Sequence, residues 1–246
     1  MEMGKLVITI MAGGVGKRMN SDLPKVLHKF KGTPMIVRIL GECLKLKVKK
    51  IIIITGKFDV IIRNTIKDYF NEGDFLRIIF VNQPTPLGTA DPIKYSLCKY
   101  DDDEKVLILN GDMPLINKDL LLNFYNYSES NSILVAELEN STGYGRIIYE
   151  NKKFIKIVEE KDCNEEEKKI KIINSGVYKI NSIDLKNYIP KINNNNKQEE
   201  YYLTDIIDLL VKDEKDIKTF KINPNDNKLI LGVNSKEQLF NLEKIY

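Results

Sequence analysis

Residues 6–19 read LVITIMAGGVGKRM. The run from Leu6 to Met11 is short, apolar and rich in β-branched residues, which is typical of a buried strand. It ends at a cluster of glycines, which allow a tight turn and let backbone N–H groups come close to a bound phosphate. The stretch therefore predicts a buried strand that leads through a glycine-rich turn.

Strand-like and helix-like segments alternate four times outward from this turn. Thr33 and Pro34 resemble the N-cap and first residue of a helix that continues to about Lys47. The alternation predicts an α/β, Rossmann-like fold with a mostly parallel central sheet and helices on both faces. Near-continuous apolar strands agree, because parallel strands are buried on both sides. The expected strands are 6–11, 51–55, 78–81 and 105–109, and the helices after the first are 59–70 and 90–100.

The pattern changes after about residue 130, where strand-like runs dominate. Ser235 to Gln238 matches a capping box, which predicts a final helix to the C-terminus. We expect one domain over 1–246, with an α/β part (about 1–130), a β-rich part (about 131–234) and a C-terminal helix (about 235–246). The later strands are expected at 133–138, 145–149, 154–159, 171–179 and 216–222, and a helix at 203–210.

Composition narrows the functional classes. The 38 basic and 35 acidic residues nearly cancel to a net charge of +3, without a basic stripe, so we expect no nucleic-acid partner. Three scattered cysteines and a single histidine argue against disulfides, His-rich metal sites and a Ser-His-Asp triad. The apolar runs are too short for a membrane span. We expect a cytoplasmic enzyme without membrane attachment.

The glycine loop suits phosphate binding but does not prove it. Its spacing matches neither a Walker A loop nor a complete Rossmann fingerprint, so a purely structural turn remains an alternative. Arg18 supplies a planar cation for phosphate oxygens, and Lys25 follows at a proline-fixed position. Two cations beside a glycine loop would suit a triphosphate, although Lys25 alone could be a solvated surface lysine.

Residues 13–28 closely resemble the signature of nucleoside-triphosphate–sugar-phosphate nucleotidylyltransferases, and the run SDLPKVLH at 21–28 is the most specific part. Within them, the chain is most similar to N-acetylglucosamine-1-phosphate uridylyltransferases, over nearly its whole length. The resemblance implies the nucleotide-diphospho-sugar transferase fold, with a nucleotide-binding part over about 1–130 and a sugar-binding part over about 131–234. It also implies formation of UDP-N-acetylglucosamine and pyrophosphate from UTP and N-acetylglucosamine-1-phosphate. Bifunctional relatives carry an acetyltransferase β-helix, whose hexapeptide repeats we do not find here.

The same resemblance implies a Mg²⁺ site and two catalytic cations. Asp112 follows a predicted strand, where it could hold a metal or simply cap a turn. Similar enzymes use the Asp of such a Gly-Asp pair as one metal ligand and an Asn corresponding to Asn234 as the other. We expect in-line attack on the α-phosphate, with Arg18 holding the departing pyrophosphate and Lys25 stabilising charge at the α-phosphate.

Nucleotide contacts are expected in three places. The amide of Gln83 can both donate to and accept from uracil, and similar enzymes read the base at the positions of Gln83, Gly88 and Thr89. The chain departs from them directly afterwards, where Ala90-Asp91 replaces the usual Gly-His. The other candidate nucleotide-binding residues are Ala12, Gly13, Gly14, Gly16 and Gly111.

Sugar contacts rest on the resemblance alone. Glu159 could equally be a surface charge, Tyr202 a core aromatic and Asn174 a turn former. The candidate sugar-binding residues are Gly145, Glu159, Asn174, Tyr202 and Thr204.

Two other functions stay open at this stage. One is a nucleotidylyltransferase for another sugar-1-phosphate or base, which the Ala90-Asp91 departure keeps alive. The other is a non-catalytic regulatory subunit that binds a nucleotide-sugar, which the presence of both Arg18 and Asp112 disfavours. The oligomeric state is open.

Overall fold

The central strands of this computed structural model, which describes residues 3–46 and 48–246, lie where the apolar pattern predicts them. β1 (Met3–Met11) pairs in parallel with β4 (Val48–Thr55) on one side and with β6 (Lys105–Asn110) on the other. β5 (Ile78–Asn82) extends the sheet in parallel with β4. The predicted parallel core of an α/β fold is therefore confirmed.

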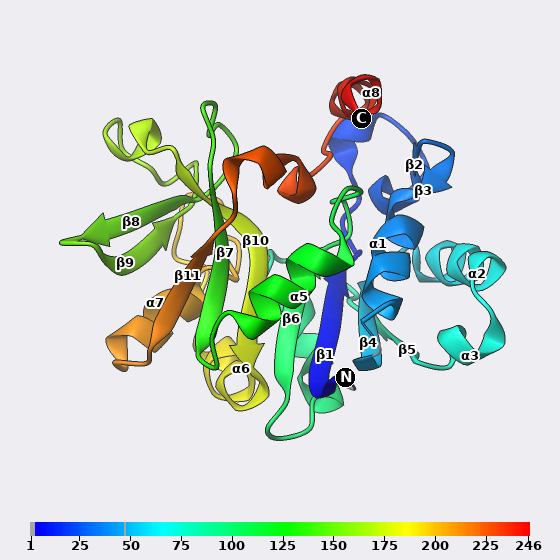
Figure 1. The fold of residues 1–246 in the computed structure, drawn as a ribbon, viewed down its shortest axis with the longest axis horizontal. Helices are drawn as coiled ribbons and strands as arrows, with labels where there is room; N and C mark the ends of the chain where they lie inside the picture. Colours follow the sequence, from blue (N-terminus) through cyan, green and yellow to red (C-terminus); the bar gives the residue numbers. More distant parts are fainter. Residues whose placement is uncertain (1–2, 47) are drawn as a thin grey trace.

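Helices connect these strands and cover the sheet (Figure 1). In the described residues the α-helices are α1 (Met35–Leu44), α2 (Asp59–Tyr69), α3 (Glu72–Phe75), α4 (Asp91–Ser96), α5 (Lys118–Asn126), α6 (Ser182–Tyr188), α7 (Asp205–Lys212) and α8 (Lys236–Ile245). Short 3-10 helices are η1 (Lys17–Met19), η2 (Lys25–Leu27), η3 (Leu97–Lys99), η4 (Glu167–Lys169), η5 (Ile189–Lys191) and η6 (Pro224–Ile230). α3, α5 and α6 have no counterpart among the helices predicted from the sequence.

Two cores lie on opposite faces of the sheet because successive strand residues point to opposite sides. Leu6 and Ile8 of β1 pack into the core under α1, α2 and α5. Val7 and Ile52 pack into the other core, under α4, α6 and α7. Burial on both faces explains why these strands are almost entirely apolar.

The second half of the chain extends the same sheet with both antiparallel and parallel strand pairs. β10 (Ile172–Asn181) is antiparallel to both β6 and β7 (Asn131–Glu137), and β11 (Ile217–Lys221) is parallel to β7. β8 (Arg146–Glu150) and β9 (Lys153–Val158) form an antiparallel hairpin that joins the sheet through β10. The predicted β-rich part is confirmed. The strand order is β11-β7-β10-β6-β1-β4-β5.

The predicted start of the first helix is wrong. Thr33 and Pro34 form β3 (Thr33–Pro34), which pairs with β2 (Lys29–Phe30), and α1 begins at Met35. Pro34 has φ −53° and ψ 138°, an extended backbone that suits a strand edge as well as a helix entry. The predicted end of this helix, Lys47, lies outside the described residues, and α1 ends at Leu44.

The final helix packs back onto the first half of the chain, near β2 and β3 (Figure 1). Leu242 and Val233 are buried against Phe30 and Met35 in a small separate core. Ser235 accepts from the backbone N–H of Gln238 at 3.2 Å, so the predicted helix start is confirmed. The C-terminal segment is thereby anchored beside the glycine loop.

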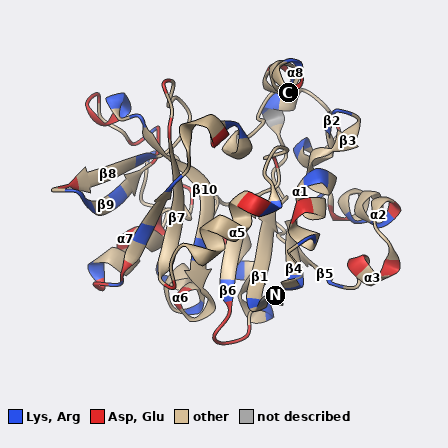
Figure 2. Cartoon of the chain, in the orientation of Figure 1, with Lys and Arg blue, Asp and Glu red and all other residues tan. Residues whose placement is uncertain are grey.

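Basic and acidic residues are interspersed over the elements (Figure 2), consistent with the small net charge. Among residues 3–46 and 48–246, no helix combines the length and apolar character that crossing a membrane requires.

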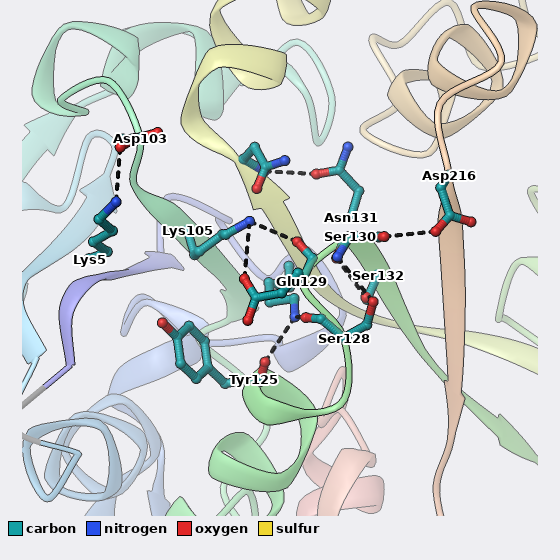
Figure 3. A network of polar contacts seen from close by, with 12 residues as sticks. Lys5, Asp103, Lys105, Tyr125, Ser128, Glu129, Ser130, Asn131, Ser132 and Asp216 are labelled. Atoms are coloured by element: carbon teal, nitrogen blue, oxygen red, sulfur yellow. Dashed lines mark hydrogen bonds and ion pairs between the residues drawn. The ribbon is translucent and has the colours of Figure 1, made fainter. Parts of the chain in front are cut away.

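Lys179 of β10 is a buried cation that lies at the C-terminal end of α5. Only 2% of the residue is exposed, and its ammonium donates to the carbonyl oxygens of Tyr125, at 2.8 Å, and Ser128. Figure 3 shows Tyr125 and Ser128 within the polar network that joins α5 to the neighbouring strands. A lysine at this end of a helix satisfies carbonyl groups that have no partner within the helix.

Lys179→Met is expected to lower the free energy of unfolding by about 1–3 kcal/mol, because two backbone carbonyls lose their donor. Burial lowers the pKa of Lys179 from 10.5 to about 8. Between these values the unfolded chain keeps a proton that the folded chain has released, so this group's contribution to stability rises with pH. The loss caused by Lys179→Met should therefore be larger at about pH 9.5 than at about pH 7.5. Urea unfolding at both pH values measures it, with exposed Lys218→Met as control; a pH-independent difference would contradict the assignment.

Candidate active site

Two cavities open at the carboxyl ends of β1 and β6. The larger has a volume of about 520 Å³ and the smaller about 210 Å³. Met11 and Asn110, the last residues of the two strands, line both cavities, and so does Asp112. Ligands of open α/β sheets bind at this edge, because the loops after parallel strands converge there.

The smaller cavity gathers most of the predicted nucleotide-binding residues. Ala12 lies behind its wall and is 1% exposed. Gly16 supports the wall from outside: it has φ +68°, and a Cβ there would lie 2.6 Å from the Cβ of Lys25. Glycine at this position therefore lets the loop pack against Lys25. The predicted residues that line the cavity are Gly13, Gly14, Lys25, Gln83, Gly88, Thr89, Gly111 and Asp112.

The loop of residues 87–90, which contains the predicted base contacts Gly88 and Thr89, is held by the segment that precedes α7. The backbone N–H of Tyr201 donates to Leu87 O at 2.9 Å, and Ala90 N–H donates to Tyr201 O at 2.8 Å. The hydroxyl of Thr89 accepts from Leu203 N–H at 2.8 Å. Gly88 has φ +118° and lies so close to Tyr201 that a Cβ would meet its backbone at 2.5 Å. Any larger residue at 88 would push the loop away from this support.

The larger cavity gathers three of the five predicted sugar-binding residues, Gly145, Glu159 and Asn174, together with Arg18, Asp112 and Asn234. The other two, Tyr202 and Thr204, are not among the described residues that line this cavity, and Leu203 between them in the sequence lines it instead. The Thr204 hydroxyl instead donates to Glu159 Oε1 at 2.9 Å from behind. The Tyr202 hydroxyl accepts from Gln198 Nε2 at 2.8 Å.

Asp112, Asn234 and Lys25 meet where the two cavities join. The ammonium of Lys25 donates to Asp112 Oδ2 and, at 3.0 Å, to Asn234 Oδ1. Only 17% of the Lys25 side chain and 12% of the Asp112 side chain are exposed. One carboxylate oxygen and one amide oxygen thus converge on a cation, and oxygen donors of this kind are those that Mg²⁺ prefers. The residues present fit a divalent cation.

Asn234 is brought to Asp112 by backbone contacts across the fold. Val233 N–H donates to the carbonyl oxygen of Asp112 at 2.9 Å. The side chain of Gln238 in α8 accepts from Asn234 N–H at 2.7 Å. Gly232 lies beside the carboxylate, since a Cβ there would be in van der Waals contact with Asp112 Oδ1 at 3.4 Å. The first turn of α8 therefore fixes one of the two predicted metal ligands.

Comparison with known proteins identifies the family of this chain. The model of a family described as "Nucleotidyl transferase" matches residues 7–225. The chain belongs to the nucleotidyl transferase family. It is 44% identical over 248 aligned residues to a "Probable UDP-N-acetylglucosamine pyrophosphorylase" of Acanthamoeba polyphaga mimivirus, covering 98% of this chain and 96% of that protein.

One further relative and one solved structure extend the comparison. The "Bifunctional protein GlmU" of Aliarcobacter butzleri (strain RM4018) is 40% identical over 99% of this chain, and the chain spans 54% of its length. The fold also matches the crystal structure of a UDP-glucose pyrophosphorylase in complex with UDP-glucose. That match has a TM-score of 0.76 at 17% identity and covers 99% of this chain and 98% of the other.

Arg146 of this nucleotidyl transferase is a site-supporting residue that the sequence analysis does not select. Its guanidinium is buried, pairs with Glu160 at 2.7 Å and donates to the carbonyl oxygen of Tyr144. It therefore ties the loop before β8 to the segment after β9, the two walls on which Gly145 and Glu159 lie. The sequence feature that could have pointed to Arg146 is its position directly after the loop glycines Gly143 and Gly145.

The carboxyl group of Glu159 lies in a poorly solvated part of the larger cavity. Burial raises its pKa above the usual 4.5, the hydroxyl of Thr204 opposes the shift, and the charges of Asp162 and Glu200 add to it. Such a carboxyl group is a strong hydrogen-bond acceptor once a ligand excludes water. Its place opposite Gly145 suits recognition of neutral hydroxyl groups.

Proposed function

We propose that this nucleotidyl transferase joins UTP and N-acetylglucosamine-1-phosphate into UDP-N-acetylglucosamine and pyrophosphate. The observation that carries the proposal is the position of Asp112, which lines both the glycine-loop cavity and the larger cavity. A nucleotide in one cavity and a sugar phosphate in the other would bring their phosphates together at this residue. The similarity to a pyrophosphorylase of UDP-N-acetylglucosamine supports the choice of substrates.

The reaction needs no protein nucleophile. An oxygen of the sugar-1-phosphate attacks the α-phosphorus of UTP, a new P–O bond forms, and the bond to the bridging oxygen of pyrophosphate breaks. Catalysis of this kind depends on alignment and on neutralising phosphate charge. The backbone of Gly13 and Gly14, both on the wall of the smaller cavity, can approach phosphate oxygens closely.

Charged residues at the junction have separate roles. Lys25 stabilises charge at the α-phosphate, and Arg18, exposed on the wall of the larger cavity, holds the departing pyrophosphate. Asp112 and Asn234 are the proposed ligands of Mg²⁺, which would neutralise phosphate charge when bound. Gln83, Gly88 and Thr89 contact the base, and Gly145, Glu159 and Asn174 contact the sugar.

Glu159→Gln is expected to raise KM for the sugar phosphate about 10- to 100-fold, the loss of one hydrogen bond to a charged group. KM for UTP should change little, because Glu159 lines only the larger cavity. Steady-state kinetics with each substrate varied in turn measures the two constants. Exposed Glu150→Gln in β8 is the matched control. Equal effects on both KM values would contradict the assignment of Glu159 to the sugar.

The direct test is pyrophosphate release by the purified protein mixed with UTP, N-acetylglucosamine-1-phosphate and MgCl₂. We expect release that EDTA abolishes and that excess Mg²⁺ restores. Replacement of N-acetylglucosamine-1-phosphate by glucose-1-phosphate or galactosamine-1-phosphate should slow it. Release with none of these sugar phosphates would overturn the proposed function.

A further inference from the structure

We propose that Asp91 determines the preference for a uracil base by fixing the orientation of the Gln83 side-chain amide. The inference rests on the proposed function, since it assumes that the smaller cavity holds the base. Asp91 does not contact the base itself. It is a positioning residue behind the one that does.

The contact between the two side chains is short and buried. Gln83 Nε2 donates to Asp91 Oδ2 at 2.6 Å, and the two residues are 5% and 7% exposed. The backbone N–H of Gln83 also donates to Thr55 O at 2.8 Å, so the residue is held at both ends. Water does not compete freely for a pair buried to this extent, and the interaction dictates which way the amide faces.

The two residues face different spaces. Gln83 lines the smaller cavity beside Gly13, whose position is such that a Cβ would lie 3.1 Å from Gln83 Oε1. Asp91, the first residue of α4, instead lines a separate cavity of about 150 Å³ together with Leu87 and Tyr95. The carboxylate therefore acts on the amide from the side opposite the nucleotide.

The chemistry of the pair leaves one orientation. An ionised carboxylate can only accept hydrogen bonds, so the NH₂ group of the amide must face Asp91 and the carbonyl oxygen is left for the ligand. N3 of uracil carries a hydrogen and can donate to this oxygen. N3 of cytosine carries a lone pair and would face it as a second acceptor. Without a carboxylate at 91 the amide could rotate by half a turn and accommodate either base.

Asp91→Asn tests the proposal, because an amide at 91 can either donate or accept. The ratio of kcat/KM for UTP to that for CTP should fall about tenfold or more, with the value for CTP rising. KM for the sugar phosphate should stay within about twofold, since Asp91 is remote from the larger cavity. Asp119→Asn is the matched control, an exposed Asp in the first turn of α5.

Binding gives a second readout that does not require turnover. Calorimetric titration with UDP and CDP should show the same loss of discrimination in Asp91→Asn. Asp91→Ser, whose hydroxyl also donates or accepts, serves if the Asn variant does not fold. A wild-type preference for uridine nucleotides that both variants retain would overturn this inference alone. A wild type that binds UDP and CDP equally would overturn it too, whereas failure of every sugar phosphate in the release assay would overturn the proposed function.

Discussion

Asp112→Asn is expected to lower kcat for pyrophosphate release at least about a hundred- to a thousandfold. The substitution keeps the shape of the side chain but removes the negative charge at the junction of the two cavities. It also leaves the ammonium of Lys25, 17% exposed, without its carboxylate partner. Both changes disturb the place where the reacting phosphates would meet.

Metal binding separates this role from a structural one. Titration with Mn²⁺, followed by electron paramagnetic resonance in the presence of UTP, should show weaker binding in Asp112→Asn than in the wild type. Asp119→Asn is again the control, and urea unfolding shows whether the variant is folded. A folded variant with near-normal turnover and unchanged Mn²⁺ affinity would remove Asp112 from the site.

Lys25→Met is expected to lower kcat by a similar factor, about a hundred- to a thousandfold, for a different reason. Methionine keeps part of the apolar stem that packs against Gly16 but cannot stabilise charge on phosphate. Asp112 and Asn234 both keep their oxygens, so Mn²⁺ affinity should be retained or increased. Asp112→Asn should therefore weaken Mn²⁺ binding and Lys25→Met should not, whereas both should lower kcat by a similar factor.

Exposed Lys29→Met, four positions along, is the matched control for Lys25→Met. Loss of Mn²⁺ binding in Lys25→Met would mean that this lysine organises the metal site rather than the α-phosphate. An unchanged kcat would mean that it has no role in transfer.

The parallel core was predictable because its signals are local. Buried strands such as β1 and β4 contain near-continuous apolar runs, and each is followed by glycine within two residues. The loop after β1 and Asp112 after β6 could also be found, because ligands gather at the carboxyl edge of such a sheet.

Other features depend on contacts between distant segments, which local patterns do not encode. Thr33 and Pro34 suit a helix start, yet pairing with β2 takes them into a strand. Tyr202 and Thr204 lie in the segment that reaches the larger cavity. The residue of this segment that lines the cavity is Leu203, which stands between them in the sequence. The hydrogen bond between Gln83 and Asp91 depends on how β5 and α4 pack together.

Asn234 shows the same limit most clearly, since only a family resemblance selects it. It shares the Lys25 ammonium with Asp112 although 122 positions separate the two residues, and this depends on the packing of α8 against Phe30 and Met35. No spacing rule connects two residues that far apart.

The late position of Asn234 also has a consequence for protein synthesis. A growing chain makes the glycine loop and Asp112 first, and it reaches Asn234 only 122 residues after Asp112. The parallel strands β1, β4, β5 and β6 all precede Asp112 in the chain, so all of them have been made long before Asn234. Lys25 would be the first cation to meet Asp112 in such a chain, and the second oxygen donor would join them last.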